Sequence, residues 1–264
     1  INLGALSHQQ GYYTKAGTYL EKALLIFREI GDRQGEGWAL SHLGRLSAEC
    51  GSYTRATADL EQALFIYQEI GDRHGQGFGF ADLCLLLHQL GDDQTALEHG
   101  QRGLLIAQEL GDRLTEGSSL IRLGWALTGL GRLTEAAETC QRALDLGRES
   151  GEHALTTESL AALACVSLAQ GDLTQAQAQV DEILAYLENN SLAGTDEPFR
   201  VYLTCYRVLY ANQDPRAREI LTTAYRLLRS RAANVGDDEL QRSFLEDVTA
   251  HREVAEAFER LSTG

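Results

Sequence analysis

The phrase Gly-Asp-Arg recurs in the chain at a constant spacing of forty residues, beginning at Gly31, Gly71 and Gly111. Each time it follows a segment whose apolar residues have helical spacing. A catalytic motif normally occurs once, where the chemistry takes place, whereas a phrase at a fixed period is typical of a joint between repeated structural units. The period therefore predicts an array of similar units in which each unit contacts its neighbours.

Each unit of the array is expected to contain two helices. In the second unit, apolar residues such as Leu40 and Leu43 recur at helical spacing and predict a helix over about 34–50. A second apolar-periodic segment predicts a helix over about 54–70, after a short turn. The chain has only two prolines, Pro198 and Pro215, which also favours helix over most of its length.

The three residues of the phrase have separate expected roles at the joint. Glycine at the end of a helix takes the left-handed conformation without steric cost. The aspartate that follows is suited to cap the next helix. The arginine is expected to bend back toward the preceding helix. These roles fall on Gly31, Gly71 and Gly111, on Asp32, Asp72 and Asp112, and on Arg33, Arg73 and Arg113, with Glu29, Glu69 and Glu109 as the expected arginine partners.

Small residues recur at the same period and predict close packing between helices. Alanine occupies one position of the second helix in five units, namely Ala16, Ala56, Ala96, Ala136 and Ala176. The third unit departs from the pattern because Gly100 and Gly103 stand where a bulky residue and alanine are expected. These two glycines indicate either a close backbone approach or a softer point in the array.

The repeated pattern resembles the tetratricopeptide repeat, in the forty-residue form found in Leu-Gly-Asn adaptor proteins and many bacterial regulators. The residues that carry the resemblance in the second unit are Leu43, Gly44, Gly51, Tyr53, Ala56, Leu60, Ala63 and Leu64. The resemblance implies an all-α fold, a right-handed superhelix of about six helix pairs with a C-terminal capping helix. It covers residues 1–232, with repeats near 1–31, 32–71, 72–111, 112–151, 152–191 and 197–232, and leaves 237–262 as the capping region.

The phrase RSFLEDVTAHREV in the capping region resembles the closing segment of repeat arrays in bacterial multidomain signalling ATPases and regulators. The chain also lacks methionine and opens within the repeat pattern. Both features suggest the C-terminal sensor arm of a longer cytoplasmic protein, in which any catalytic domain lies outside this chain.

Several kinds of chemistry are not indicated by the sequence. A net charge of −15 argues against nucleic acid as the main partner. Five cysteines without metal-site spacing fit a reducing cytoplasm, and no apolar run is long enough to suggest a membrane span. No phosphate-binding loop, zinc motif or nucleophile motif is visible. We therefore expect no catalytic residues, no metal and no cofactor.

The resemblance implies that the first helix of each unit lines a concave groove that binds a partner. In the adaptor proteins an asparagine before Leu-Gly clamps a peptide backbone, and only Asn2 keeps that residue here. Aromatic and arginine side chains are enriched at binding hot spots, which favours Trp125 beside Arg122. The candidate partner-binding residues are Asn2, Trp38, His42, Arg45, Phe78, Asp82, Arg122 and Trp125.

The function expected from these features is recognition of a protein or peptide segment. Two alternatives remain open at this point. The array could serve as an intramolecular scaffold or self-association surface, contacting other domains of its parent protein. It could also be a receptor for a small molecule or a peptide signal.

Overall fold

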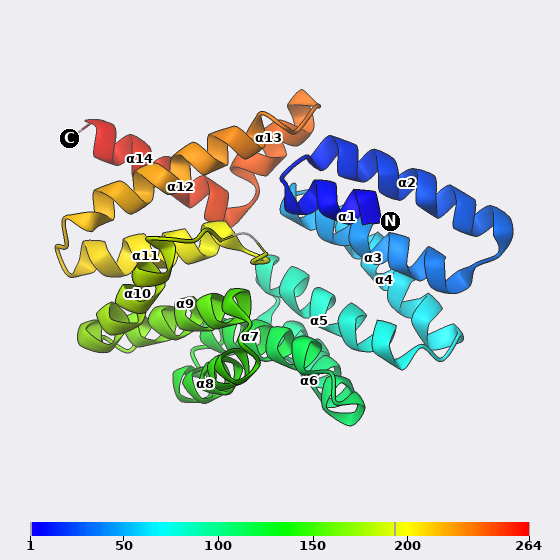
Figure 1. Ribbon diagram of the computed structural model, residues 1–264, viewed down its shortest axis with the longest axis horizontal. Helices are drawn as coiled ribbons and strands as arrows, with labels where there is room; N and C mark the ends of the chain where they lie inside the picture. The colour runs from blue at the N-terminus through cyan, green and yellow to red at the C-terminus, as the bar shows by residue number, and fades with distance from the viewer. Residues whose placement is uncertain (1, 193, 264) are drawn as a thin grey trace. The chain divides into compact units, whose positions relative to one another are not determined.

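The computed structural model describes residues 2–192 and 194–263, without the side chains of residues 2, 9, 262 and 263. The described residues form α-helices and no strands, which confirms the expected all-α fold (Figure 1). Twelve of these helices follow one another as six pairs: α1 (Asn2–Gln9) and α2 (Tyr13–Ile30), α3 (Arg33–Glu49) and α4 (Tyr53–Glu69), α5 (Arg73–Gln89) and α6 (Asp93–Leu110), α7 (Arg113–Gly129) and α8 (Leu133–Ser150), α9 (His153–Ala169) and α10 (Leu173–Leu187), and α11 (Pro198–Ala211) and α12 (Arg216–Ala232). Two further helices, α13 (Asp238–Glu246) and α14 (Thr249–Thr263), follow the last pair.

The helices are distributed over two compact units. Unit 1 comprises residues 1–116 and 230–248, and unit 2 comprises residues 117–229 and 249–264. The chain thus leaves unit 1 within α7, returns to it at the end of α12, and finishes in unit 2. The division expected from the sequence, with a solenoid over 1–232 and a cap over 237–262, stays a prediction.

The joints between helices have the predicted geometry. Gly31 and Gly71 adopt left-handed backbone angles, with φ of 70° and 71°. Asp32 and Asp72 then cap the following helices, since one carboxylate oxygen of each accepts the N–H of the residue three positions on, at 2.9 Å. Positive φ recurs every twenty residues, at Gly11, Gly31, Gly51, Gly71, Gly91, Gly111, Gly131, Gly151 and Gly171. The expected helix bounds in the second pair are correct to within one residue.

The arginine of the phrase contacts a different partner from the one expected. Arg33 pairs with Glu36 and with Glu69 on α4, and Arg73 pairs with Glu109 on α6. The expected partners of these arginines, Glu29 and Glu69, lie on the preceding second helix, so that prediction was wrong. The first turn of α3 or α5 instead lies beside the last turn of the second helix of its own pair. The arginine therefore links the start of the first helix to the end of the second helix within one pair.

Small residues allow the helices of a pair to approach closely. Ala16, Ala56, Ala96, Ala136 and Ala176 are fully buried. A Cβ atom on Gly44 would lie 2.6 Å from the side chain of Leu60, and one on Gly103 would lie 3.1 Å from the carbonyl oxygen of Gly77. Gly103 is thus a site of close backbone approach between α6 and α5, as one of the two sequence interpretations held.

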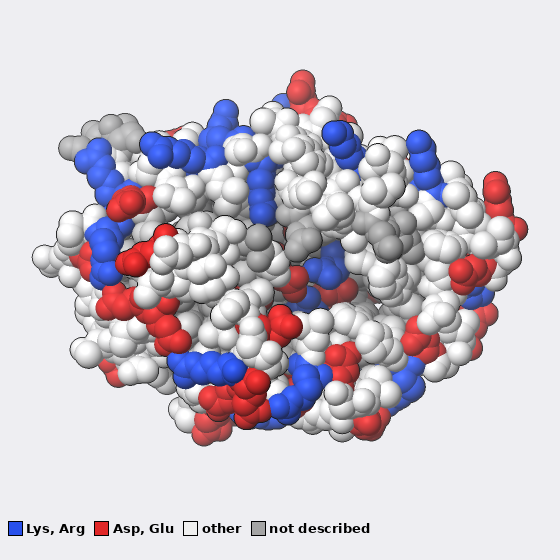
Figure 2. Space-filling view, in the orientation of Figure 1, with Lys and Arg blue, Asp and Glu red and all other residues white. Residues whose placement is uncertain are grey.

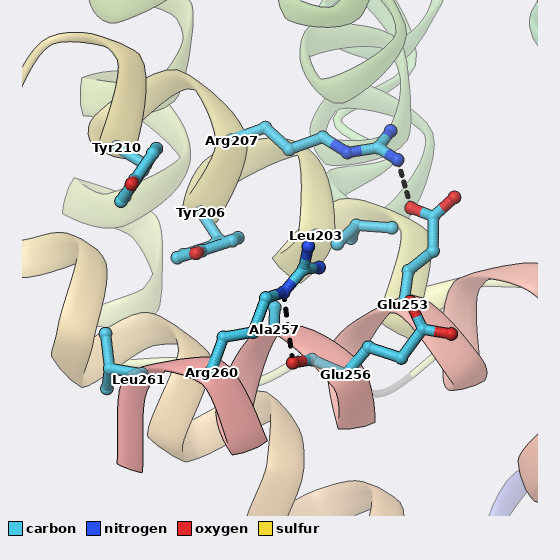
Figure 3. Close-up of a pocket in the computed structure, with 9 residues that line it drawn as sticks. All are labelled: Leu203, Tyr206, Arg207, Tyr210, Glu253, Glu256, Ala257, Arg260 and Leu261. Carbon is cyan, nitrogen blue, oxygen red and sulfur yellow. Dashed lines mark hydrogen bonds and ion pairs between the residues drawn. The ribbon is translucent and has the colours of Figure 1, made fainter. Parts of the chain in front are cut away.

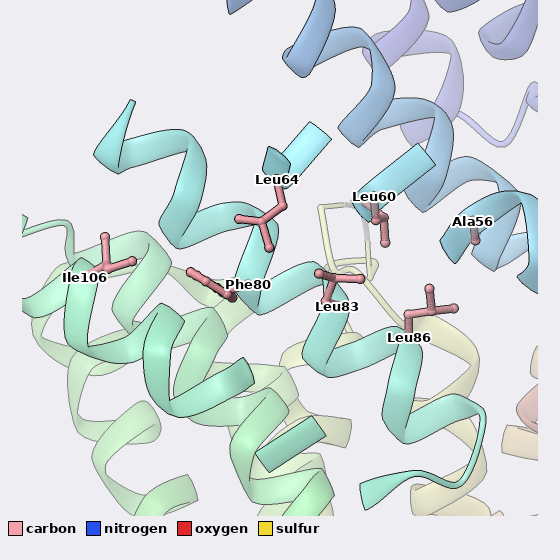
Figure 4. Close-up of a cluster of buried hydrophobic side chains, with 7 residues drawn as sticks. All are labelled: Ala56, Leu60, Leu64, Phe80, Leu83, Leu86 and Ile106. Atoms are coloured by element: carbon pink, nitrogen blue, oxygen red, sulfur yellow. The ribbon is translucent and has the colours of Figure 1, made fainter. Parts of the chain in front are cut away.

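The core of unit 1 continues from one pair to the next (Figure 4). Leu60 and Leu64 of α4 contact Phe80 and Leu83 of α5, and Ile106 of α6 closes the far side of this cluster. Burial of each such side chain contributes about 1.5–3 kcal/mol to folding. The cluster therefore holds successive pairs together as well as the two helices of one pair.

The last two helices pack in different units. In unit 1, the ring of Phe244 on α13 lies 5.3 Å from that of Tyr13, and the Gly236 N–H donates to the Thr14 hydroxyl at 2.7 Å. In unit 2, Phe258 on α14 stacks on Tyr225 of α12 with ring centroids 4.0 Å apart. The closing segment thus contributes a buried aromatic contact to unit 1 and a partly buried one to unit 2.

Candidate partner-binding face

The candidate residues of α3 form one stripe on the side of the helix that faces away from the core. Trp38, His42 and Arg45 succeed one another at helical spacing, while their neighbours Leu40 and Leu43 are buried. Trp38 is 44% exposed, and its ring lies 4.8 Å from that of His42. We call the solvent-facing side of the first helices of the pairs the A-helix face.

In unit 1 the A-helix face extends from α3 to α5. Phe78 occupies the same position of its pair as Trp38 and is half-buried, with its ring 4.9 Å from that of His74. Asp82 is buried, and its carboxylate lies 3.9 Å from the guanidinium Nε of Arg45. The structure therefore places five of the predicted residues on two helices that an ion pair joins, with one aromatic ring on each helix.

The electrostatics of this region depend on His42. Burial and the nearby positive charge of Arg45 lower the pKa of His42 to about 4. The imidazole is therefore neutral at neutral pH, and the positive charge of this stripe of α3 comes from Arg45, two turns from Trp38. Tryptophan and arginine are both enriched among the residues that contribute most to binding.

The first helix pair also contributes to this side of unit 1. His8 of α1 lies 2.8 Å from the carboxylate of Glu49 on α3, which places these two helices next to each other. The side chain of Asn2 lies outside the described part of the structure. The predicted peptide-clamping role of Asn2 therefore stays a prediction.

In unit 2 the corresponding positions are covered. Arg122 and Trp125 of α7 are only 5% and 7% exposed. A guanidinium nitrogen of Arg122 lies 3.0 Å from the carboxylate of Asp196, and the guanidinium of Arg200 lies 4.8 Å from the centroid of the Trp125 ring. The structure places both predicted residues beneath the chain's own segment before and within α11.

A carboxylate on α9 completes this arrangement. One oxygen of Glu158 accepts the backbone N–H groups of Asp196 and Glu197, the latter at 3.2 Å. Burial, with the neighbouring charge of Asp196, raises the pKa of Glu158 to about 8. Sequence reasoning missed Glu158 because its backbone partners come from a connection outside the repeat pattern.

Sequence reasoning also missed a hollow between α11 and α14 (Figure 3). It has a volume of about 580 Å³ and is lined by Tyr206 and Tyr210 on one side and by Arg260 on the other. Arg207 and Glu253 form an ion pair at its edge. The two tyrosines fall at helical spacing in the sequence, but only the placement of α14 makes them line a hollow.

Charged side chains of both signs lie on the face shown in Figure 2. Acidic and basic side chains are interspersed over its lower part, and basic side chains predominate along its upper edge. Among the described residues, no group of three or more His, Cys, Asp or Glu side chains is placed to hold a metal ion. None of the described helices combines the length and apolar character needed to cross a lipid bilayer.

Sequence profiles identify the repeats. Two tetratricopeptide repeat families match the chain, one over residues 1–69 and the other over residues 117–148. A search of curated proteins finds no significant match.

Solved structures share the fold of the chain. The chain is similar to a Rap protein complexed with competence and sporulation factor, at 16% identity over 98% of this chain and 74% of that chain, with a TM-score of 0.66. It is also similar to a signal transduction ATPase with numerous domains and a tetratricopeptide repeat sensor from Pyrococcus horikoshii, at 18% identity over 100% of this chain and 42% of that chain, with a TM-score of 0.65. A third similar structure is the Rap conjugation gene regulator of plasmid pLS20 in complex with the Phr* peptide, at 14% identity over 87% and 69% of the two chains, with a TM-score of 0.62.

The profiles and the fold agree. The chain carries tetratricopeptide repeats over residues 1–69 and 117–148, and its described residues have the fold of a tetratricopeptide repeat array. Such arrays are binding scaffolds, so the class of protein is a protein- or peptide-binding repeat module.

Proposed function

We propose that the A-helix face of unit 1 binds an extended or helical segment of a partner protein. The observation that carries this proposal is Trp38, a tryptophan left 44% exposed on α3, on the same stripe of that helix as Arg45 two turns further along. Exposed tryptophan and arginine side chains are the types that contribute most at protein interfaces. Phe78 supplies a second apolar contact one pair further along, and Asp82 sets the orientation of Arg45.

The setting of this module is also part of the proposal. The chain is the sensor or scaffold arm of a larger cytoplasmic bacterial regulator, and its partner is either a separate protein or another domain of the same regulator. Two observations support this setting. The chain covers 42% of a signalling ATPase with a tetratricopeptide repeat sensor, and two similar Rap structures contain a bound factor or peptide.

The binding site can be tested with peptides selected on the wild-type protein from a random phage-displayed library. The affinity of the best peptide would then be measured by fluorescence anisotropy for the wild type, Trp38→Ala and Arg45→Gln. Loss of a hot-spot side chain costs about 2 kcal/mol or more, so each variant should bind about thirtyfold more weakly.

A matched control is available in the same unit. Phe65 on α4 is 62% exposed, but it lies on a second helix. Phe65→Ala should bind the selected peptide as the wild type does. Equal affinity for the wild type, Trp38→Ala and Arg45→Gln would show that the partner does not use this face.

A further inference from the structure

Equivalent positions of the repeat differ in exposure between the second and fourth pairs. Arg45 on α3 and Trp125 on α7 occupy the same position two repeats apart, as do His42 and Arg122. The side chain of Arg45 is 29% exposed, whereas Trp125 and Arg122 are 7% and 5% exposed. Within unit 2, the segment over residues 195–200 supplies the contacts that cover α7 at this point. The same position of the repeat is thus partly open to solvent on α3, whereas on α7 another segment of the chain covers it.

The covered region has the components of a peptide-binding site. We call Arg122, Trp125 and Glu158 the α7–α9 seat. Arg122 holds a side-chain carboxylate, that of Asp196, at 3.0 Å. Glu158 accepts two consecutive backbone N–H groups, those of Asp196 and Glu197. The ring of Trp125 receives a cation, since the Arg200 guanidinium lies 4.8 Å from its centroid.

These contacts do not depend on the occupant being part of this chain. A guanidinium pairs with any carboxylate of suitable reach, and a carboxyl oxygen that accepts two successive N–H groups recognises a backbone rather than a particular side chain. The seat therefore selects an extended segment in which an acidic residue is followed by a residue other than proline. We propose that the α7–α9 seat is a binding site for an acidic peptide segment of a partner, and that Asp196 and Glu197 are its internal occupant.

This inference rests on the proposed function, because it assigns peptide recognition to first helices of unit 2 as well as to those of unit 1. The charges at the seat bear on how firmly the internal occupant is held. Asp196 and Glu197 bring two further carboxylates next to Glu158, and the Asp196 side chain remains 34% exposed to solvent. Burial and, after it, the neighbouring charge of Asp196 raise the pKa of Glu158.

An internal occupant lowers the apparent affinity for an external one, because only the fraction of molecules with an open seat can bind. Weakening the internal occupant should therefore strengthen external binding. The test uses a fluorescently labelled peptide with the sequence of residues 194–200, Gly-Thr-Asp-Glu-Pro-Phe-Arg, and a matched peptide with Asn and Gln in place of the two acids. Affinities would be measured by anisotropy on the full chain as wild type, Asp196→Asn, and the double variant Asp196→Asn/Arg122→Gln.

The expected result is that Asp196→Asn binds the acidic peptide about tenfold or more tightly than the wild type does. The amide peptide should bind the same variant at least about tenfold more weakly than the acidic peptide, because it offers Arg122 no carboxylate. The double variant should lose the preference for the acidic peptide. Circular dichroism and thermal unfolding would establish that each variant is folded.

A second measurement needs no substitution. Hydrogen exchange of the Asp196 and Glu197 amides in the wild type should accelerate when the acidic peptide is added in excess, since both lose their acceptor on Glu158. The proposal is overturned if these amides are unaffected at millimolar peptide and if Asp196→Asn gains no affinity. Binding of selected peptides that depends on Trp38 would survive that result, so failure of the seat and failure of the proposed function are distinguishable.

Discussion

At the scale of single residues, the repeated Gly-Asp-Arg phrase divides into a conformational part and an electrostatic part. Gly71 has a left-handed backbone, and Asp72 caps α5 through the N–H of Gly75. Arg73 and Glu109 pair at the surface, where an exposed ion pair contributes about 0–1 kcal/mol. The glycine and the aspartate therefore fix the joint, and the arginine adds less to its stability.

Two glycine-to-alanine substitutions should have opposite effects. Gly71→Ala introduces no clash, since nothing lies within 4 Å of the added Cβ, but it forces alanine into a left-handed conformation and should lower the free energy of unfolding by about 1–2 kcal/mol. Gly17 lies inside α2 with ordinary helical geometry, and its added Cβ would meet only Leu46 at 3.5 Å. Gly17→Ala should raise the free energy of unfolding by about 0.5–1 kcal/mol. Urea titrations followed by circular dichroism measure both changes, and effects of the same sign would contradict this account of the joint.

Glu158 should make stability depend on pH. Its pKa is raised to about 8 in the folded chain, whereas an unfolded glutamate titrates near about 4.3. Between these values the folded state retains a proton that the unfolded state releases, so this group's contribution to stability is present at low pH and declines as the pH rises toward 8. Glu158→Gln keeps an acceptor oxygen and removes the titration. Urea midpoints at several pH values should therefore fall more steeply for the wild type than for the variant, and parallel pH profiles would be the contrary result.

At the scale of secondary-structure elements, the first helices of the pairs provide the candidate binding residues, and the helices after the last pair complete the two cores. Trp38 and Phe78 lie on the solvent-facing sides of α3 and α5 because the opposite sides of these helices carry the apolar stripe of the repeat. Phe244 on α13 lies outside the repeat pattern, yet it is fully buried against Tyr13 in unit 1. Helix α13 thus supplies part of the core of the first repeats.

Removal of the Phe244 side chain tests this role of α13. Phe244→Ala should lower the free energy of unfolding by about 3–5 kcal/mol, the range for a buried phenylalanine replaced by alanine. Phe65→Ala is the matched control, because that ring is 62% exposed and its loss should change stability by less than about 0.5 kcal/mol. Equal effects of the two substitutions in denaturant titrations would mean that α13 does not contribute to the core of unit 1.

At the scale of the whole molecule, the period of the sequence predicted the repeated features of the fold well. The left-handed Gly31, the capping Asp32 and the buried alanines all follow from local chemistry that recurs every forty residues. The partner of Arg33 was not predicted correctly, because a period gives the position of a residue within its helix and not which neighbouring helix end lies across from it. The burial of Trp125 could not be predicted for a related reason, since the forty-residue period does not show that Arg200 on α11 lies over it.

The sequence predicted which residues of α3 lie on one side of the helix, but not their burial or their contacts with distant segments. The sequence placed Trp38, His42 and Arg45 on one side of a first helix, and the structure places them there. The sequence did not indicate that His42 would be neutral or that Glu158 would accept the backbone N–H of Asp196. Both features depend on burial and on contacts between distant segments.

The central claim is that the chain binds its partner through the A-helix face of unit 1. The most direct test is hydrogen exchange mass spectrometry of the wild type with and without a saturating amount of the peptide selected on it. The account predicts slower exchange in segments 33–49 and 73–89, which contain Trp38 and Phe78, and little change in segment 53–69, which contains Phe65. Protection confined to segment 53–69, or protection that persists unchanged in Trp38→Ala at the same peptide concentration, would contradict the claim.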